Sequence, residues 1–171
     1  VPVGKHRLVT NRHVTDAGRL ELNGCPFDYT VVSQGDAVGG REDWAVVETN
    51  GSGALPPTYF DFERKLEVGT KVYIQGYWDQ TYPDPVIVAG TVVNPPRQSD
   101  SLDGVVCIDT NYDYTYHGVS GGAVYIVEDG TPIVVAIYTG LREWRVPFLN
   151  IRTAWAHTAV RPPLGSNLTR G

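Results

Sequence analysis

A glycine-rich stretch around Ser120 is the strongest chemical signal in this sequence. It reads His117-Gly-Val-Ser-Gly-Gly-Ala123. A serine hydroxyl is a poor nucleophile at neutral pH, so it needs a base to take its proton and donors to hold the oxyanion that forms. Glycines let the backbone turn sharply, so the amides of Gly118 and Ser120 could point at one spot. The alternative is a plain turn between two strands, which the motif alone does not exclude.

A base and an acid in suitable surroundings occur earlier in the chain. His13 follows an apolar stretch at 8–9, and an imidazole titrates near neutrality, which suits a proton shuttle. Asp43 opens the apolar run 44–47, where a carboxylate could accept a hydrogen bond from the imidazole and fix its tautomer. Each residue alone has a simpler interpretation: His13 as a surface or core histidine, and Asp43 as a solvated strand end.

The elements that must position these residues are short strands. Runs rich in Val, Ile, Tyr and Thr alternate with turn residues, and the chain holds 19 Gly and 12 Pro. Many short strands with frequent turns favour a sandwich or barrels over an α/β sheet. The predicted strands cover residues 7–10, 29–33, 44–48, 71–77, 86–93, 105–109, 123–127 and 133–138.

One stretch near the end of the chain predicts a helix. Apolar residues recur at close to helical spacing between 148 and 160, Asn150 could cap the start, and Pro162 would stop the continuation. A break between two halves is expected in residues 50–57, where Gly, Ser and Pro concentrate.

The composition argues against several classes of protein. The net charge is −5 and the basic residues are scattered, so the basic stripe of a nucleic-acid-binding protein is missing. The longest apolar run, 132–138, is far shorter than the ~20 residues of a membrane span. Cys25 and Cys107 form one disulfide or remain two free thiols, and their separation does not suit a metal site. We expect no metal and no cofactor, and leave the location open while favouring an extracytoplasmic or secreted one.

The three chemical signals occur in the order His, Asp, Ser, as in chymotrypsin-type enzymes and unlike subtilisin or the α/β-hydrolases. Their surroundings resemble the trypsin-like peptidases, and most of all the bacterial high-temperature-requirement (Deg-type) branch. The resemblance is carried by Leu8-Val-Thr-Asn-Arg-His-Val14, Asp43-Trp-Ala-Val-Val47, Leu66-Glu-Val-Gly-Thr-Lys-Val-Tyr-Ile-Gln-Gly76, Val88-Ala-Gly-Thr-Val92, Gly118-Val-Ser-Gly-Gly-Ala-Val124, Gly130-Thr-Pro-Ile-Val-Val-Ala-Ile-Tyr-Thr139 and Val146-Pro147. It spans residues 8–160 and implies an all-β fold, a chymotrypsin-like double six-stranded β-barrel with a C-terminal helix and the site between the barrels.

The resemblance also implies roles for single residues. His13, Asp43 and Ser120 match the catalytic triad, and Gly118 and Ser120 match the oxyanion-hole donors. One wall of the primary specificity pocket would be built by Tyr114, Thr115, Tyr116 and His117. The strand edge that binds the substrate backbone, by strand addition, would be Ile137, Tyr138, Thr139 and Gly140. The implied activity is that of a serine endopeptidase, which acts on polypeptides through an acyl-enzyme.

The N-terminal segment departs from the family pattern. Only 12 residues precede His13, whereas the family places two further strands there to close its first barrel. An open barrel exposes backbone edges and part of its core. Three explanations stay open: the chain is truncated, an extra segment or chain completes the barrel, or the first barrel is reduced. We expect an N-terminal barrel over 1–55, a C-terminal barrel with its closing helix over 56–160, and a loose tail over 161–171.

Two positions bear on activation and specificity. Val119 stands where digestive trypsins have an Asp that pairs with a released N-terminus, so activation by that ion pair is not expected; the Deg-type branch also lacks this Asp. Tyr114 stands where enzymes that cut after Lys or Arg have an acid, which favours apolar or small P1 residues. His117 at the pocket lip would instead favour an acidic P1 residue, or has no role there.

Two other functions compete with the endopeptidase hypothesis. One is a catalytically silent trypsin-like domain that uses its cleft to bind peptides or proteins. The other is an unrelated β-sandwich binding module, which would leave His13 and Ser120 on distant surfaces.

Overall fold

The structure is a computed structural model that describes residues 1–18, 20–22, 25–38, 40–51, 53–95, 105–112, 116–145 and 153–168 of the 171-residue chain. For 143–145 and 153–155 it describes the backbone only.

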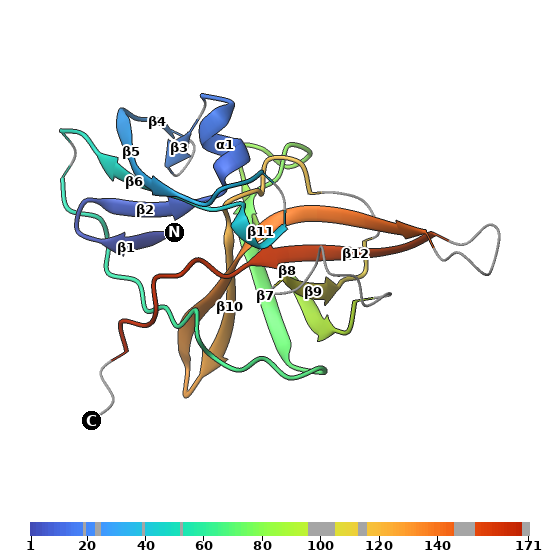
Figure 1. Ribbon diagram of the computed structural model, residues 1–171. Coiled ribbons are helices and arrows are strands. Elements are labelled where there is room, and N and C mark those ends of the chain that lie inside the picture. Colours follow the sequence, from blue (N-terminus) through green and yellow to red (C-terminus); the bar gives the residue numbers. More distant parts are fainter. Residues whose placement is uncertain are drawn as a thin grey trace.

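The elements, labelled in Figure 1, are β1 (Pro2–Gly4), β2 (Arg7–Thr10), α1 (Arg12–Asp16), β3 (Glu21–Leu22), β4 (Cys25–Pro26), β5 (Tyr29–Gln34), the 3-10 helix η1 (Gly40–Glu42), β6 (Ala45–Thr49), β7 (Lys71–Tyr77), β8 (Pro85–Val93), β9 (Val105–Asp109), β10 (Ala123–Glu128), β11 (Thr131–Arg145) and β12 (Thr153–Val160). Each predicted strand coincides with one of these.

The C-terminal half forms a closed barrel in the order β10-β11-β12-β9-β8-β7, with antiparallel neighbours. Successive residues of a strand face opposite sides, so alternate side chains fill the barrel. In β7, for example, Val72 and Ile74 are buried in this core while Lys71 and Gln75 are exposed. This barrel confirms the expected closed unit, and the turn that carries Ser120 lies directly before its strand β10.

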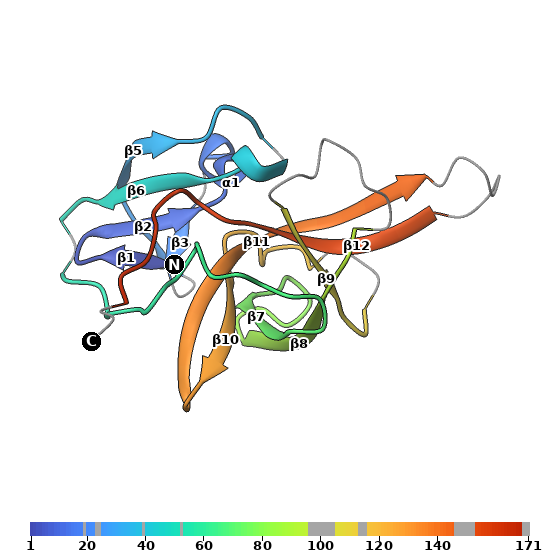
Figure 2. The same ribbon diagram turned by 60° about the horizontal axis from the view of Figure 1, so that its bottom comes forward.

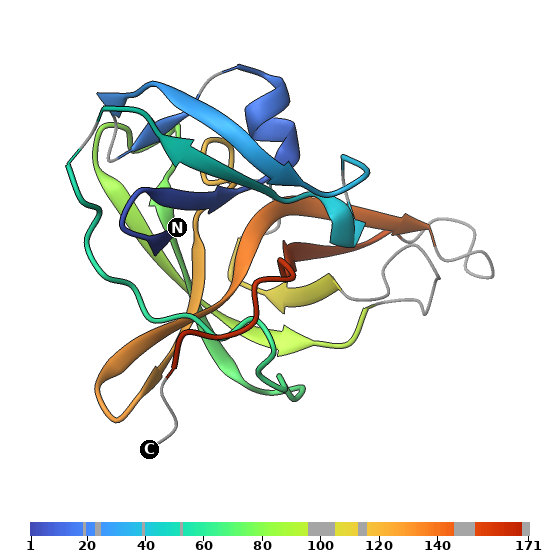
Figure 3. The ribbon, with the colours of Figure 1, turned by 60° about the vertical axis from the view of Figure 1, so that its left-hand side comes forward.

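The N-terminal half forms a four-stranded sheet, in the order β1-β2-β6-β5, which does not close within the described part of the chain. Consecutive residues of β2 face opposite sides of it. Leu8 packs with Val47 on one side, and Val9 packs with Phe60 and Ile137 on the other. This second cluster joins the sheet to β11 of the barrel, and Figures 2 and 3 show the two lying side by side. The fold is therefore an incomplete chymotrypsin-like fold, as expected.

The closing helix predicted for the end of the second barrel is wrong. Thr153–Val160 form strand β12, which pairs with β11 on one side and with β9 on the other, while 146–152 lie outside the described residues. Residues 156–160 are all buried. A strand buried on both faces has no polar–apolar alternation, so its apolar residues can fall at helical spacing.

The segment after β12 also differs from its prediction as a loose tail. Within residues 161–168, Asn167 accepts a hydrogen bond from the amide of Phe60 (2.8 Å) and donates one to the carbonyl of Thr58 (2.7 Å). Leu164 packs on the cluster between sheet and barrel. These contacts tie the segment to the connection between the two halves. The division of the chain near residue 55 stays a prediction.

Candidate active site

His13 lies in the first turn of α1, directly after β2, and contacts Asp43 twice. Its backbone amide donates to Asp43 Oδ1 at 2.9 Å, and its Nδ1 lies 2.6 Å from Asp43 Oδ2. The side chain of Asp43 is 1% exposed and that of His13 is 33% exposed. A carboxylate only accepts hydrogen bonds, so Nδ1 carries the proton and Nε2 is left as the basic nitrogen of the neutral ring.

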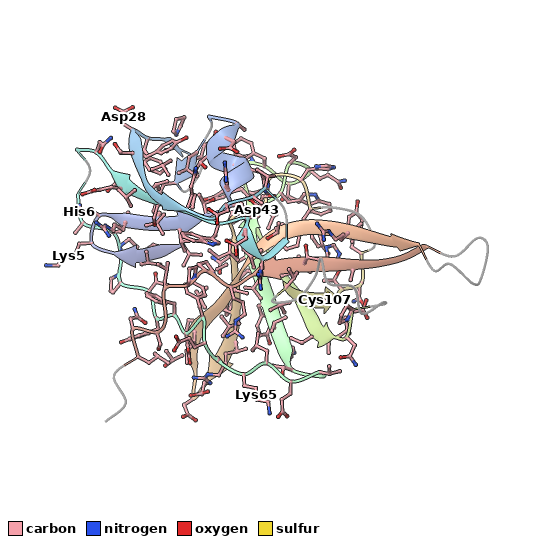
Figure 4. The ribbon with its side chains drawn as sticks, in the orientation of Figure 1. Lys5, His6, Asp28, Asp43, Lys65 and Cys107 are labelled. Atoms are coloured by element: carbon pink, nitrogen blue, oxygen red, sulfur yellow. The ribbon has the colours of Figure 1, made fainter. Side chains whose placement is uncertain are left out.

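Strand pairing brings these two residues together. β2 pairs with β6 in an antiparallel register in which Thr10 lies opposite Ala45. His13 follows the end of β2, and Asp43 precedes the start of β6. Figure 4 shows Asp43 where the N-terminal sheet meets the barrel. The acid at the start of one strand and the base after the other are thus neighbours because of the register.

Ser120 lies in a tight turn in which some backbone amides donate hydrogen bonds to carbonyls and others do not. Gly118 and Gly121 have φ values of +94° and +84°, a region that favours glycine. The amides of Val119, Gly121 and Gly122 donate to the carbonyls of Tyr116, Tyr138 and Val119, respectively. Within the described ranges, the amides of Gly118 and Ser120 donate to no protein acceptor. Two alternate amides beside the hydroxyl are therefore available for an anion.

The Ser120 turn is linked to the His13–Asp43 pair through Thr139 and Asn11. The Ser120 hydroxyl donates to the carbonyl of Thr139 at 3.2 Å. The buried side chain of Asn11 donates to Thr139 Oγ1 (3.2 Å) and to the carbonyl of Asp43 (2.9 Å). Hydrogen bonds therefore connect the Ser120 turn with Asp43 through Thr139 and Asn11, and the Ser120 hydroxyl is directed at the Thr139 carbonyl.

A second close approach holds the turn against β2. A Cβ placed on Gly121 would lie 2.2 Å from Thr10 Oγ1, so only a glycine fits there. Thr10 is the last residue of β2 and stands three positions before His13. This contact fixes how near the turn lies to the start of α1.

The residues predicted to bind substrate are in different situations. Tyr114 and Thr115 lie outside the described residues. Tyr116 is buried among other aromatic rings, whereas His117 is exposed. Along β11, Ile137 and Tyr138 are fully buried, so only their backbone could meet a ligand, and Thr139 and Gly140 are half-buried.

The far part of β11 has one free side. β10 pairs with β11 only up to Ile137. In the described ranges, residues 141–145 pair with β12 alone. An extended peptide can add to such an edge through backbone hydrogen bonds, and the edge begins just beyond the Ser120 turn.

Sequence reasoning missed the linking role of Asn11 and Thr139. Asn11 precedes α1, where an asparagine usually caps the helix, yet its side chain makes no cap hydrogen bond and reaches across to Asp43 and Thr139. Nothing local in the sequence distinguishes the two uses. His157, in β12, was also missed because its segment was predicted as a helix.

Three other features of the described residues concern metal ligands, cysteines and membrane spans. No three His, Cys, Asp or Glu residues there come together in a way that could hold a metal ion. Cys25 is exposed, Cys107 is buried, and both are free thiols. None of the described helices has the length and apolar character needed to span a membrane.

Comparison with known proteins gives one finding on family and one negative result. The family model for the trypsin-like peptidase domain matches residues 1–137, which include the His13–Asp43 pair, the Ser120 turn and most of the barrel core. No curated protein matches the chain.

Proposed function

Because this chain belongs to the trypsin-like peptidase family, we propose that it is a serine endopeptidase in which Ser120 is the nucleophile, His13 the general base and Asp43 its partner. The observation that carries the proposal is the 2.6 Å contact between His13 Nδ1 and the buried Asp43 carboxylate. That contact leaves Nε2 as a base, which is what a serine hydroxyl needs to become a nucleophile.

In the proposed mechanism, Ser120 first rotates about its Cα–Cβ bond, away from the carbonyl of Thr139. His13 Nε2 takes the hydroxyl proton as Oγ attacks the scissile carbonyl carbon, and the amides of Gly118 and Ser120 hold the oxyanion. His13 then protonates the leaving amine, and water removes the acyl group by the same steps in reverse. Catalytic hydrogen bonds are often unformed in the absence of substrate, so the observed rotamer is compatible with this sequence.

The likeness to the Deg-type branch is part of the proposal. It is supported by Val119, which is 2% exposed and packs in the barrel core. The turn is thus anchored by an apolar side chain, whereas digestive trypsins use an ion pair at this position. The polypeptide substrate would lie along the free edge of β11.

The experiment is covalent labelling with a fluorophosphonate, together with casein hydrolysis. Wild type should label at Ser120 and cleave unfolded casein, and Ser120→Ala should do neither. Ser33→Ala, at an exposed position of β5, is the matched control and should behave as wild type. Correctly folded wild-type protein that neither labels nor cleaves any peptide would refute the enzyme proposal.

A silent peptide-binding domain is the second candidate, and one observation favours it. The Ser120 hydroxyl donates to Thr139 and not to His13, as expected if the residue has only a structural role. Such a domain would bind extended peptides with equal affinity in wild type and Ser120→Ala and leave them intact, which peptide binding followed by mass spectrometry would reveal.

We also propose that an extended apolar segment of polypeptide completes the N-terminal sheet beside β1. This edge strand borders a groove of about 900 Å³ with apolar lining that includes Leu22, Tyr59, Tyr125 and Val134. Pro2 offers no amide at the edge, so side-chain packing would contribute more than backbone pairing. A monomeric chain that binds an apolar dye such as ANS would support a groove left open for an external segment, and a monomeric chain that binds none would count against it.

A further inference from the structure

His157 is a buried histidine that packs against aromatic residues of the barrel. It lies in β12, is 2% exposed, and stacks on the ring of Tyr116 with centroids 4.9 Å apart. Its Nε2 lies 2.6 Å from the carbonyl oxygen of Tyr112, and its Nδ1 lies 2.8 Å from the hydroxyl of Tyr138. Both ring nitrogens therefore have hydrogen-bond partners, as burial requires.

These partners fix the tautomer of His157. The carbonyl of Tyr112 only accepts, so Nε2 must carry a proton. In the neutral ring Nδ1 is then an acceptor, and the hydroxyl of Tyr138 donates to it. Burial raises the pKa of the Tyr138 phenol above its usual range, which keeps this donor protonated. With its proton directed at Nδ1, the phenol oxygen is left to accept from the backbone amide of Tyr116 (3.4 Å).

Tyr138 thereby holds the loop that carries Ser120 at both ends. Its phenol oxygen accepts the amide of Tyr116, four positions before Ser120. Its backbone carbonyl accepts the amide of Gly121, and its backbone amide donates to the carbonyl of Gly122, each at 2.9 Å. The carbonyl of Tyr116 in turn accepts the amide of Val119, so the phenol contact continues into the turn.

We propose that His157 is a positioning residue for the Ser120 loop and acts through the hydroxyl of Tyr138. The inference rests on the proposed peptidase function of that loop. His157 orients the phenol, the phenol anchors Tyr116, and the anchored segment keeps the amides of Gly118 and Ser120 directed at the reacting carbonyl. His157 touches no substrate in this scheme.

The proposal separates two kinds of substitution at position 157. A phenylalanine keeps the ring volume but removes both nitrogens. The Tyr138 hydroxyl then loses the acceptor that orients its proton, and the Tyr112 carbonyl loses one of its donors. A glutamine supplies one acceptor and one donor and has no titrating group. His157→Phe should therefore release the loop, and His157→Gln should hold it in part.

The first experiment measures kcat and KM separately on a peptide substrate. Because small misplacements of reacting groups cost large factors, kcat of His157→Phe should fall by about tenfold or more, with KM changed less than about twofold. Tyr138→Phe should have the same effect, and His157→Gln should recover most of kcat. Ile108→Val is the matched control: it shortens a buried side chain paired across from His157 and should leave kcat unchanged.

A second experiment does not depend on activity. Nitrogen-15 NMR of the histidine side chains, with the His157 signal assigned from His157→Gln, should show a proton on Nε2 and none on Nδ1. Protonation at Nδ1, or an unchanged kcat in folded His157→Phe, would overturn the proposal. An equal loss of kcat in Ile108→Val would do the same, because it would indicate general destabilisation. If wild type shows the expected tautomer but cleaves nothing, the proposed function fails and the hydrogen-bond network stands without a catalytic role.

Discussion

The carboxylate of Asp43 accepts both the backbone amide and the ring Nδ1 of His13, at 2.9 Å and 2.6 Å. Asp43→Asn would keep the shape but offer an amide group that can donate to Nδ1 and so place the ring proton on Nε2. The ring would then be unable to accept the Ser120 proton. We expect kcat/KM to fall by about 10⁴-fold with little change in folding, as measured by progress curves and circular dichroism.

Asp36→Asn is the control for this prediction. Asp36 is exposed, and its substitution removes one negative charge at a position away from the proposed site. It should leave kcat/KM within about twofold of wild type, as surface changes away from a site usually do. A comparable loss in both variants would point to net charge instead of the His13 tautomer.

The close approach of Gly121 to Thr10 gives a prediction on stability. Gly121 and Gly130 both have positive φ, at +84° and +77°, so alanine at either position incurs a backbone cost of about 1–2 kcal/mol. Gly130 has nothing within 4 Å of an added Cβ, whereas the Cβ at Gly121 would lie 2.2 Å from Thr10 Oγ1. Urea unfolding should therefore show a loss in Gly121→Ala that exceeds the loss in Gly130→Ala by about 1–3 kcal/mol. Equal losses would mean that the turn can move away from β2.

The strands were predictable because they leave local marks in the sequence, and local patterns also suggested the proposed site residues. Val72 and Ile74 alternate with polar residues as a half-buried strand should, and the residue types around Ser120, His13 and Asp43 suit their proposed chemistry. The linking roles of Asn11 and Thr139 were not predictable.

Two features depended on contacts distant in sequence. Thr139 connects Asn11 with Ser120 across separations of 128 and 19 residues, and no local pattern encodes such a contact. His157 belongs to a strand covered on both faces, whose apolar spacing is ambiguous between helix and strand. The predictions failed where burial depends on tertiary contacts that local spacing does not reveal.

The two thiols should react very differently. Cys25 is exposed, and burial raises the pKa of Cys107, which lowers the fraction present as the reactive thiolate. At pH 8, a disulfide reagent such as DTNB should modify one thiol per chain quickly and the second only after denaturation. Cys25→Ser should abolish the fast phase. Absence of any thiol in the denatured, unreduced protein would instead indicate a Cys25–Cys107 disulfide.

Cleavage specificity tests the pocket hypothesis. Tyr116 is buried among aromatic rings. By the resemblance to trypsin-like peptidases, Tyr114 would stand where enzymes that cut after Lys or Arg have an acid, so we expect cleavage after apolar or small P1 residues. A peptide library with all P1 residues, read by mass spectrometry, measures this directly. His117→Ala should leave the profile unchanged. Preferred cleavage after Asp or Glu that disappears in His117→Ala would assign the specificity to that exposed histidine.

Val119 tests whether apolar packing can anchor the Ser120 turn. Its side chain is 2% exposed, and Gly76 leaves room for it, since a Cβ on Gly76 would lie 3.0 Å from Val119 Cγ1. Val119→Ala should lower the free energy of unfolding by about 2 kcal/mol. It should also slow fluorophosphonate labelling, because the amides on either side of residue 119 lose their anchor. Val127→Ala, at a position 53% exposed, should change neither property. If labelling keeps its wild-type rate while stability falls, Val119 serves the barrel core alone and the turn is held by the hydrogen bonds of Tyr138.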